Sequence, residues 1–192
     1  PCKSADRHFS LFLSVCLSVS VMACSTAYYG AMEKVGYHKR DIMVDRVTAA
    51  KESQEEAQEQ FSSALEEMQA LLNHDGGDLQ SAYEKARDEY ESSQEAADEV
   101  SSRIDKVEDV AEALFDEWHA EIGEISKASL RRNSETKLRD TRRSYEQLVR
   151  TMRRAESKMP PILTAMKHNM RYLKHNLNAQ AIGAIKGEFA SL

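Results

Sequence analysis

From Leu79 to Ile125 the sequence places apolar or small residues at alternating steps of four and three. The positions between them are rich in Asp and Glu, and the run contains no Pro and only Gly123, near its end. Such spacing, kept for about six heptads, is typical of a long helix in a coiled coil. At about 1.5 Å per residue this helix would be roughly 70 Å long. Because so long a helix cannot bury its apolar stripe alone, the flanking segments are predicted to supply partner helices. The stripe consists of Leu79, Tyr83, Ala86, Tyr90, Ser93, Ala97, Val100, Ile104, Val107, Ala111, Leu114, Trp118, Glu121 and Ile125.

Composition agrees with an all-helical chain. The 192 residues suffice for one domain, and they include only seven Gly and three Pro. The content of Ala, Glu, Lys, Arg, Gln and Leu favours helix. A net charge of −6 predicts solubility and gives no general reason to expect a nucleic-acid partner.

The N-terminal residues have the order of a secretory signal. Lys3 and Arg7 precede an apolar run from residue 9 to residue 22, which Ala23 and Cys24 follow. This run is too short to span a membrane, so residues 1–23 are predicted to be a signal peptide. An ordinary cleaved signal peptide with incidental cysteines is one interpretation of these residues, and a lipoprotein signal is the preferred one.

Residues 21–24, Val-Met-Ala-Cys, resemble the lipobox of bacterial lipoproteins, although Met22 departs from the small or branched residue usual there. The resemblance implies that Cys24 becomes the first mature residue and carries the lipid. Ser25 after it implies delivery to the outer membrane, on its periplasmic face. Because each buried CH₂ contributes about 0.8 kcal/mol, several acyl chains would hold the protein firmly.

Residues 24–37 are predicted to be an anchor and leader, and residues 38–192 a helical coiled-coil domain. Tyr28 and Tyr29 in the leader either lie at the lipid headgroups or pack on the first helix, and packing is the preferred interpretation.

The first helix is predicted over residues 38–73 and is followed by a turn at residues 73–78, where Gly76 and Gly77 favour a helix stop. Asp78 is the expected N-cap of the next helix. So short a turn predicts that the two helices are antiparallel neighbours. The seam of the first helix is Met43, Val47, Ala50, Gln54, Ala57, Phe61, Ala64, Met68 and Leu71.

A third helix is predicted over residues 130–159, with Ser129 as its N-cap. Pro160 and Pro161 are expected to break or kink it, and a fourth segment restarts at Pro161. The predicted fold is therefore all-α, an elongated antiparallel coiled-coil bundle of three long helices, the third kinked at the Pro-Pro pair into a fourth segment. The third seam is Leu138, Thr141, Tyr145, Leu148, Met152, Ala155 and Met159, and the fourth is Leu163, Met166, Met170, Leu173, Leu177, Ala181, Ala184 or Ile185, and Phe189.

Charge inverts between the second and third helices. Residues 78–124 hold sixteen acidic and four basic residues, whereas residues 130–159 hold ten basic and four acidic ones. Pairing of the two helices within the bundle is the preferred interpretation. The alternatives are an envelope polyanion and, third, nucleic acid, which a chain of negative net charge does not favour. The candidate polyanion-binding residues are Arg131, Arg132, Arg139, Arg142, Arg143, Arg150, Arg153 and Arg154.

Motifs for catalysis, metals and cofactors were sought in the sequence without success. It contains no HExxH, no G-x-S-x-G and no glycine-rich nucleotide loop. His168 and His175 lie seven residues apart, roughly 10 Å along a helix, too far to share one metal. No catalytic residue, metal ligand or cofactor is therefore predicted.

Three runs of the chain resemble an uncharacterised proteobacterial family, domain of unknown function 2959. They are residues 27–41 (AYYGAMEKVGYHKRD), 103–115 (RIDKVEDVAEALF) and 172–181 (YLKHNLNAQA). The resemblance covers nearly all of the mature chain. It implies an all-helical, lipid-anchored envelope protein and transfers no catalytic residue.

These patterns lead to one functional hypothesis and one alternative. The hypothesis is a non-enzymatic, lipid-anchored periplasmic protein of the bacterial envelope that acts as a structural spacer or interaction adaptor. Its expected partners are the membrane, through the lipid, and an envelope protein or a second copy of the chain. The alternative is a cytoplasmic coiled-coil protein that binds nucleic acid through the basic helix 130–158.

Overall fold

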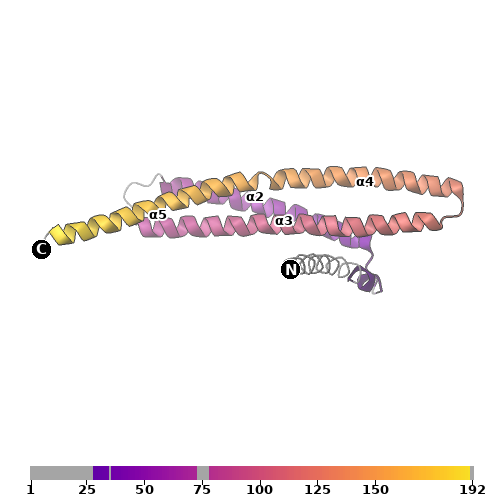
Figure 1. The fold of residues 1–192 in the computed structure, drawn as a ribbon, viewed down its shortest axis with the longest axis horizontal. Coiled ribbons are helices and arrows are strands. Elements are labelled where there is room, and N and C mark those ends of the chain that lie inside the picture. The colour runs from indigo at the N-terminus through magenta and orange to yellow at the C-terminus, as the bar shows by residue number, and fades with distance from the viewer. Residues whose placement is uncertain (1–27, 35, 73–77, 191–192) are drawn as a thin grey trace, which may run out of the picture. The chain divides into compact units, whose positions relative to one another are not determined.

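The chain folds into long helices joined by short turns (Figure 1). The computed structural model describes residues 28–34, 36–72 and 78–190, and these residues contain no strand. The long helices are α2 (Lys39–Leu72), α3 (Leu79–Glu124), α4 (Ala128–Glu156) and α5 (Met159–Ala190). Residues 28–34 are also helical. The prediction of an all-α protein is confirmed.

Two compact units divide the packing between them. The described part of the first unit comprises residues 28–34, 36–46 and 106–143, and that of the second comprises residues 47–72, 78–105 and 144–190. Helices α2, α3 and α4 contribute to both units.

The first unit has a small core around Tyr29, which is only 2% exposed and packs with Ile42 of α2 and Val110 of α3. Residues 28–34 therefore pack on the helices, as the preferred interpretation of this segment predicted for Tyr29, whereas Tyr28 remains about half exposed. The segment ends at Gly36, whose φ of 89° is a left-handed conformation that favours glycine.

Two backbone hydrogen bonds close the end of this segment. The amide of Tyr37 donates to Met32 O and the amide of Gly36 donates to Glu33 O, each at 3.0 Å. This 6→1 and 5→2 pattern is a Schellman motif, which satisfies carbonyls that the end of a helix would otherwise leave unpaired. The motif turns the chain directly into α2.

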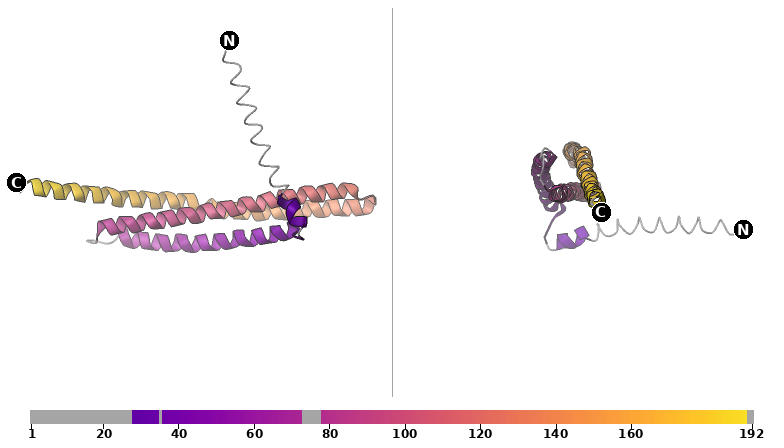
Figure 2. Two further views of the ribbon diagram at one scale, coloured as in Figure 1. Left: turned by 90° about the horizontal axis from the view of Figure 1, so that it is seen from below. Right: turned by 90° about the vertical axis from the view of Figure 1, so that its left-hand side faces the viewer.

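Contacts within the first unit make the neighbouring helices antiparallel. Lys39 of α2 bonds to Glu117 of α3, and seven residues later Arg46 donates to Lys106 O, eleven residues earlier on α3. Helix α4 lies beside α3 in the same unit (Figures 1 and 2), where Trp118 Nε1 donates to the hydroxyl of Ser134 at 3.2 Å.

The second unit contains the predicted α2 seam from Val47 onward and the predicted α3 seam from Leu79 to Ile104. Asp78 Oδ1 accepts a hydrogen bond from the amide of Gln80 at 3.0 Å, so Asp78 caps α3 as predicted. Gln60 of α2 donates to Glu89 of α3 at 3.1 Å. Three residues of the α2 seam are alanines, whose small side chains allow two helices to approach closely. The buried seam residues in this unit include Ala50, Ala57, Phe61, Ala64 and Met68 of α2 and Ala86, Ser93, Val100 and Ile104 of α3.

The interruption between α4 and α5 lies at Ser157 and Lys158, just before the Pro-Pro pair. Pro160 and Pro161 occupy the first turn of α5, where a helix needs no amide donors. The amide of Lys158 donates to Ala155 O and not to Arg154 O, its partner in a regular α-helix. The hydroxyl of Ser157 donates to Arg154 O instead, at 2.9 Å. The sequence of this turn therefore satisfies the carbonyls that the break exposes.

Beyond the break, helix α5 runs antiparallel to α3, as α4 does before it. In the second unit Arg153 of α4 contacts Asp105, and Lys167 of α5 lies over the ring of Tyr90, 5.9 Å from its centroid. Leu163, Met166 and Leu173 of its predicted seam are buried. The side chain of Ile182 further along is 62% exposed.

Three predicted details of α3 and α4 are wrong. Lys127, not Ser129, is the N-cap of α4, because the carbonyl of Lys127 accepts from the amides of residues 130 and 131. Glu121 is exposed and does not belong to the α3 seam. Val110, Phe115 and Ile122 are buried although the seam omitted them, because α3 in the first unit contacts α4 and residues 28–34 as well as α2.

The heptad seam predicted for α4 is also wrong in part, since Thr141, Leu148 and Ala155 are exposed. Several half-buried residues of α4 are instead spaced eleven apart, namely residues 134, 145 and 156 and residues 138 and 149. Eleven residues make about 20° more than three whole turns, so positions 11 apart remain nearly on one side of a straight helix. A heptad makes about 20° less than two whole turns, so over the same length a heptad seam drifts further, and in the opposite sense.

None of the helices in the described residues is both long and apolar enough to cross a membrane.

Candidate functional site

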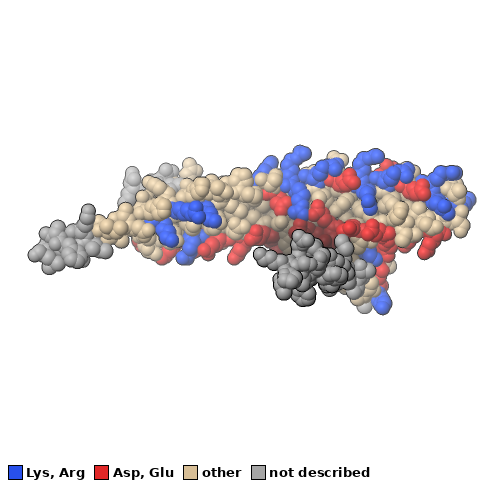
Figure 3. All heavy atoms as spheres, in the orientation of Figure 1, with Lys and Arg blue, Asp and Glu red and all other residues tan. Residues whose placement is uncertain are grey.

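Helix α4 carries nine Lys or Arg side chains and four Asp or Glu side chains. Its one buried residue is Met152, and seven of the eight arginines predicted to bind polyanions are exposed, while Arg153 is half-buried. On the face shown in Figure 3, Lys and Arg side chains gather along α4 and Asp and Glu side chains along α3. The arginines of α4 are therefore the candidate site.

These arginines form an 11-residue repeat that the sequence analysis overlooked. The pattern is an Arg-Arg pair, six other residues, a single Arg and two other residues. It gives the pairs 131–132, 142–143 and 153–154 and the single arginines 139 and 150. Because eleven residues turn a helix by about 20° more than three full circles, equivalent arginines form a nearly straight row.

The first arginine of each pair faces α3 or the turn after it. In the first unit, Arg131 donates two hydrogen bonds to Ile125 O, at 3.0 and 2.8 Å, and so holds the turn between α3 and α4. The guanidinium carbon of Arg142 lies 5.1 Å from the ring centroid of Phe115. Such a cation–π contact contributes about 0.5–1 kcal/mol at an exposed site.

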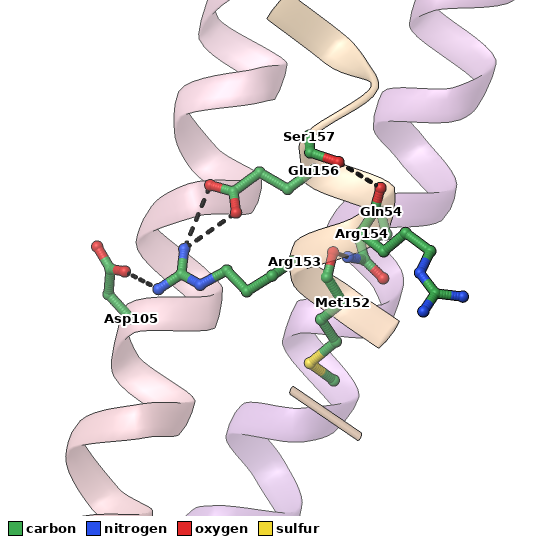
Figure 4. Close-up of polar contacts among 7 residues, drawn as sticks. All are labelled: Gln54, Asp105, Met152, Arg153, Arg154, Glu156 and Ser157. Carbon is green, nitrogen blue, oxygen red and sulfur yellow. Dashed lines mark hydrogen bonds and ion pairs between the residues drawn. The ribbon is translucent and has the colours of Figure 1, made fainter. Parts of the chain in front are cut away.

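In the second unit, Arg153 has the corresponding position, at a place where three helices meet (Figure 4). Its guanidinium bridges Asp105 of α3, at 2.5 Å, and Glu156 of α4, at 3.1 Å. Beside it, Gln54 Nε2 of α2 donates to Met152 O at 3.1 Å. Arg131, Arg142 and Arg153 are thus structural, and we call them the inner arginines.

The second arginine of each pair and the single arginines face outward, and we call them the outer arginines. In the first unit, Arg139 bonds to Thr136 Oγ1 at 2.9 Å and Arg143 lies 3.6 Å from Asp140, both within α4. Arg132 has no ion pair or hydrogen bond with another side chain that the structure describes. Exposed pairs three or four residues apart contribute only about 0.2–0.5 kcal/mol, so these arginines can exchange partners.

The outer arginines of the second unit behave in the same way. Arg150 lies 3.7 Å from Glu146 within α4, and the two side chains are 64% and 52% exposed. Arg154 points away from the bridge made by its neighbour Arg153 (Figure 4). The ion pair of Arg153 with Asp105 joins α4 to α3, as internal pairing predicted, whereas Arg143 and Arg150 pair within α4.

A second charged cluster, in the first unit, centres on Lys39, whose side chain is 12% exposed. It forms ion pairs with Glu33 and with Glu117, the latter at 3.1 Å. Burial lowers the pKa of Lys39, but its hydrogen bonds to the two carboxylates outweigh burial and raise the pKa above the ordinary value. The hydrogen bond from Lys39 lowers the pKa of Glu33. Lys39 and Glu33 are therefore charged at neutral pH, so the cluster clamps residues 28–34 to α2 and α3 and is not poised for proton transfer.

A groove of about 570 Å³ adjoins this cluster, with Leu114 and Trp118 of α3 in its wall. Among the described residues there is no group of three or more His, Cys, Asp or Glu that could hold a metal ion.

Comparison with known proteins gives one match. The sequence model of the family described as "Protein of unknown function (DUF2959)" matches residues 28–192. The chain belongs to this family. No curated protein and no solved structure matches the chain significantly.

The DUF2959 match includes residues 28–34 and helices α2 to α5, and therefore both the Lys39 cluster and the arginines of α4. The family description assigns no activity, so a function for this DUF2959 chain has to be argued from its residues. Cys24, the predicted lipidation site, lies outside the described residues and outside the matched range, as do residues 1–23.

Sequence reasoning on this DUF2959 chain selected all eight arginines as one group, whereas the structure divides them into inner and outer sets. The 11-residue spacing of the arginines is visible in the sequence and separates the inner set from the outer set, whereas the heptad pattern does not. The Lys39 cluster carried no sequence signal, because Glu117 lies 78 residues from Lys39 along the chain and reaches it only through the fold.

Proposed function

We propose that this protein is a non-enzymatic, lipid-anchored component of the bacterial cell envelope, held on the periplasmic face of the outer membrane. Its role is that of a structural spacer or an interaction adaptor. The observation that carries the proposal is the order of residues 3–24, a basic start, an apolar run of signal-peptide length and then Ala23-Cys24. The lipid on Cys24 is the membrane partner, and an envelope protein or a second copy is the other.

The finer arrangement of the helices is part of this proposal. We propose an elongated antiparallel bundle of three long helices, the third being α4 and α5 with a kink at the Pro-Pro pair. Two contacts in the second unit support it, because Arg153 before the break and Lys167 after it both reach α3, at Asp105 and Tyr90. With 46 residues, α3 is about 69 Å long, enough to act as a spacer.

Small-angle X-ray scattering tests the shape. A compact globule of this chain length has a radius of gyration of about 15–16 Å. A rod at least as long as α3 has a radius of gyration of about 20 Å or more. A value near that of the globule would refute the spacer.

The proposed location is tested by fractionating cells that express the full chain or its Cys24→Ala variant. Each is grown with and without globomycin, which inhibits lipoprotein signal peptidase. We expect the full chain in the outer-membrane fraction, with acyl groups found on Cys24 by mass spectrometry. The substitution should move the protein to the soluble fraction. A processed chain free of fatty acid would contradict the proposal.

The alternative function, nucleic-acid binding in the cytoplasm, is favoured by one observation, the row of exposed outer arginines on α4. Clustered cations bind DNA through counterion release, so the affinity would fall steeply with salt. Exposed acidic residues of α3, among them Asp109, Glu112 and Asp116, oppose this function because they repel a polyanion. Salt-dependent binding of DNA by the purified chain, together with a cytoplasmic location, would establish the alternative.

A further inference from the structure

One flank of the α3–α4 pair in the first unit carries acidic and basic side chains side by side. Two contacts fix how the helices face each other, Trp118 with Ser134 and Phe115 with Arg142. With about 100° of rotation per residue, the step from Trp118 to Phe115 turns about 60° around α3. The step from Ser134 to Arg142 turns about 80° around α4. Both steps lead to the same flank of the pair.

Further rotation around each helix in the same direction, beyond Phe115 on α3 and residue 142 on α4, leads to charged residues. On α3 the next residues are Glu112 and then Asp116, about 60° and 100° beyond Phe115. On α4 they are the outer arginines Arg139 and Arg143, about 60° and 100° beyond residue 142. All four side chains are exposed. Figure 3 shows this relation over the helices, with blue side chains along α4 and red ones along α3.

The four residues also lie at nearly the same height along the helices. The contact between Phe115 and residue 142 sets the level, and α3 and α4 run in opposite directions. At about 1.5 Å per residue, both contacts place Arg143 within about 5 Å of the level of Glu112 and Arg139 within about 5 Å of the level of Asp116. A basic row and an acidic row therefore run beside each other at one height.

A flank of this kind selects its partner. A polyanion attracted to the arginines would meet the carboxylates beside them, and a basic surface would meet the arginines. A second copy of the same flank, turned by a twofold axis parallel to the helices, places each basic row over the acidic row of the other copy. A twofold interface requires this kind of self-complementary surface. Because such an axis leaves heights unchanged, the opposite charges meet at the same level.

We propose that this flank is an interface between two copies of the chain, in which Arg139 and Arg143 of each copy pair with Asp116 and Glu112 of the other. The helices of the two copies run parallel in this dimer. The proposal rests on the adaptor role in that it names its partner, but it does not depend on the lipid on Cys24. If Cys24 carried no lipid, the proposed location at the outer membrane would be refuted, but the proposed interface would not.

The contacts that Arg139 and Arg143 make within α4 are weak enough to be replaced by contacts with the second copy. Arg143 lies 3.6 Å from Asp140 in a pair whose side chains are 78% and 63% exposed. Arg139 is bonded to a hydroxyl group, Thr136 Oγ1, and not to a carboxylate. An exposed ion pair changes an association constant by about 1.4- to 5-fold. Two pairs in each direction therefore give roughly 4- to 600-fold, a dimer that is weak and sensitive to salt.

The test uses two differently tagged full-length copies, co-expressed and purified in mild detergent at low and at high salt. In the basic-reversed variant Arg139→Glu and Arg143→Glu make the whole flank negative, and in the acid-reversed variant Glu112→Lys and Asp116→Lys make it positive. We expect the natural copies to co-purify at low salt and to separate at high salt. Each variant should fail to pair with itself, and the two variants should pair with each other.

The mixed pair also shows that the variants fold, because a misfolded copy could not restore association. A matched control reverses two exposed acids of α2, Glu55→Lys and Glu59→Lys, and should leave the pairing of natural copies unchanged. The proposal is refuted if natural copies do not associate at low salt, if either reversed variant pairs with itself, or if the mixed pair fails.

Binding to a polyanion is the remaining outcome to separate. The basic-reversed variant is compared with the natural chain on DNA and on vesicles containing anionic lipid. If it loses binding to either while self-association persists, the arginines serve a polyanion and the dimer proposal is overturned. If neither probe distinguishes the two proteins while self-association is lost, the interface is supported.

Discussion

Tyr29 determines whether residues 28–34, the segment next to the proposed anchor, are held on the folded helices. Its side chain is 2% exposed in the core with Ile42 and Val110, and its hydroxyl accepts a hydrogen bond from Arg46 at 2.8 Å. A segment of seven residues is too short to be a stable helix in water by itself. We therefore expect Tyr29→Ala to release the segment without unfolding the long helices.

The magnitude follows from the buried area. A buried tyrosine removes roughly 150–250 Å² from water, worth about 4–6 kcal/mol at about 25 cal/mol per Å². A compact unfolded chain already buries about 10–40% of this area, which leaves about 3 kcal/mol as a working value. That corresponds to a change of roughly 100-fold in the docking equilibrium. Tyr29→Phe removes only the hydroxyl, and since Arg46 keeps its bond to Lys106 O at 2.7 Å, the cost should be about 1 kcal/mol.

Hydrogen exchange read by mass spectrometry is the assay. Peptides over residues 28–37 should lose protection by about two orders of magnitude in Tyr29→Ala and by about fivefold in Tyr29→Phe. Peptides over residues 50–70, in the second unit, provide the internal control and should remain unchanged. Unchanged protection of residues 28–37 in Tyr29→Ala would refute the reasoning, because it would mean that the tyrosine does not hold the segment.

Three further outcomes are expected. Ile104→Ala removes a side chain that is 0% exposed and should lower the free energy of unfolding in urea by about 2–5 kcal/mol. Arg142→Ala should cost about 0.5–1 kcal/mol in the same assay, because it removes the cation from the ring beneath it, whereas Arg143→Ala should change stability by less than about 0.5 kcal/mol. The lowered pKa of Glu33 stabilises docking above its unfolded value of 4.5, and this stabilisation is lost as pH falls through the folded pKa. The raised pKa of Lys39 stabilises docking below 10.5 and is lost as pH rises through the folded pKa, so protection of residues 28–37 should fall at both extremes, and Lys39→Met should flatten this profile.

Residues close together in sequence were predictable, whereas contacts between distant segments were not. The seam of α2 and the cap at Asp78 follow from local spacing and side-chain chemistry, and both are present. Burial of Val110 and Phe115 depends on which segments approach α3 from its other sides. Residues 28–34 are one of these segments, and nothing in their sequence shows that Tyr29 reaches residue 110.

In α4 the buried side could have been predicted from the sequence, but from the 11-residue repeat and not from a heptad. Tyr145 satisfies a heptad and the 11-residue repeat alike, so it could not decide between the two. Leu148 decides, because a heptad buries it and the 11-residue repeat leaves it 38% exposed. The arginines carry the same information more clearly, since every member of the row has a counterpart eleven residues away where α4 is long enough.

The arginine repeat limits how α4 can change length over evolution or by design. Removing one residue would rotate everything beyond it by about 100°, whereas removing seven or eleven would rotate it by only about 20°. Only a change of eleven residues would also keep the Arg-Arg pairs and the single arginines in register along the row. Viable insertions and deletions in α4 should therefore come in whole repeats, each changing the helix by about 16 Å.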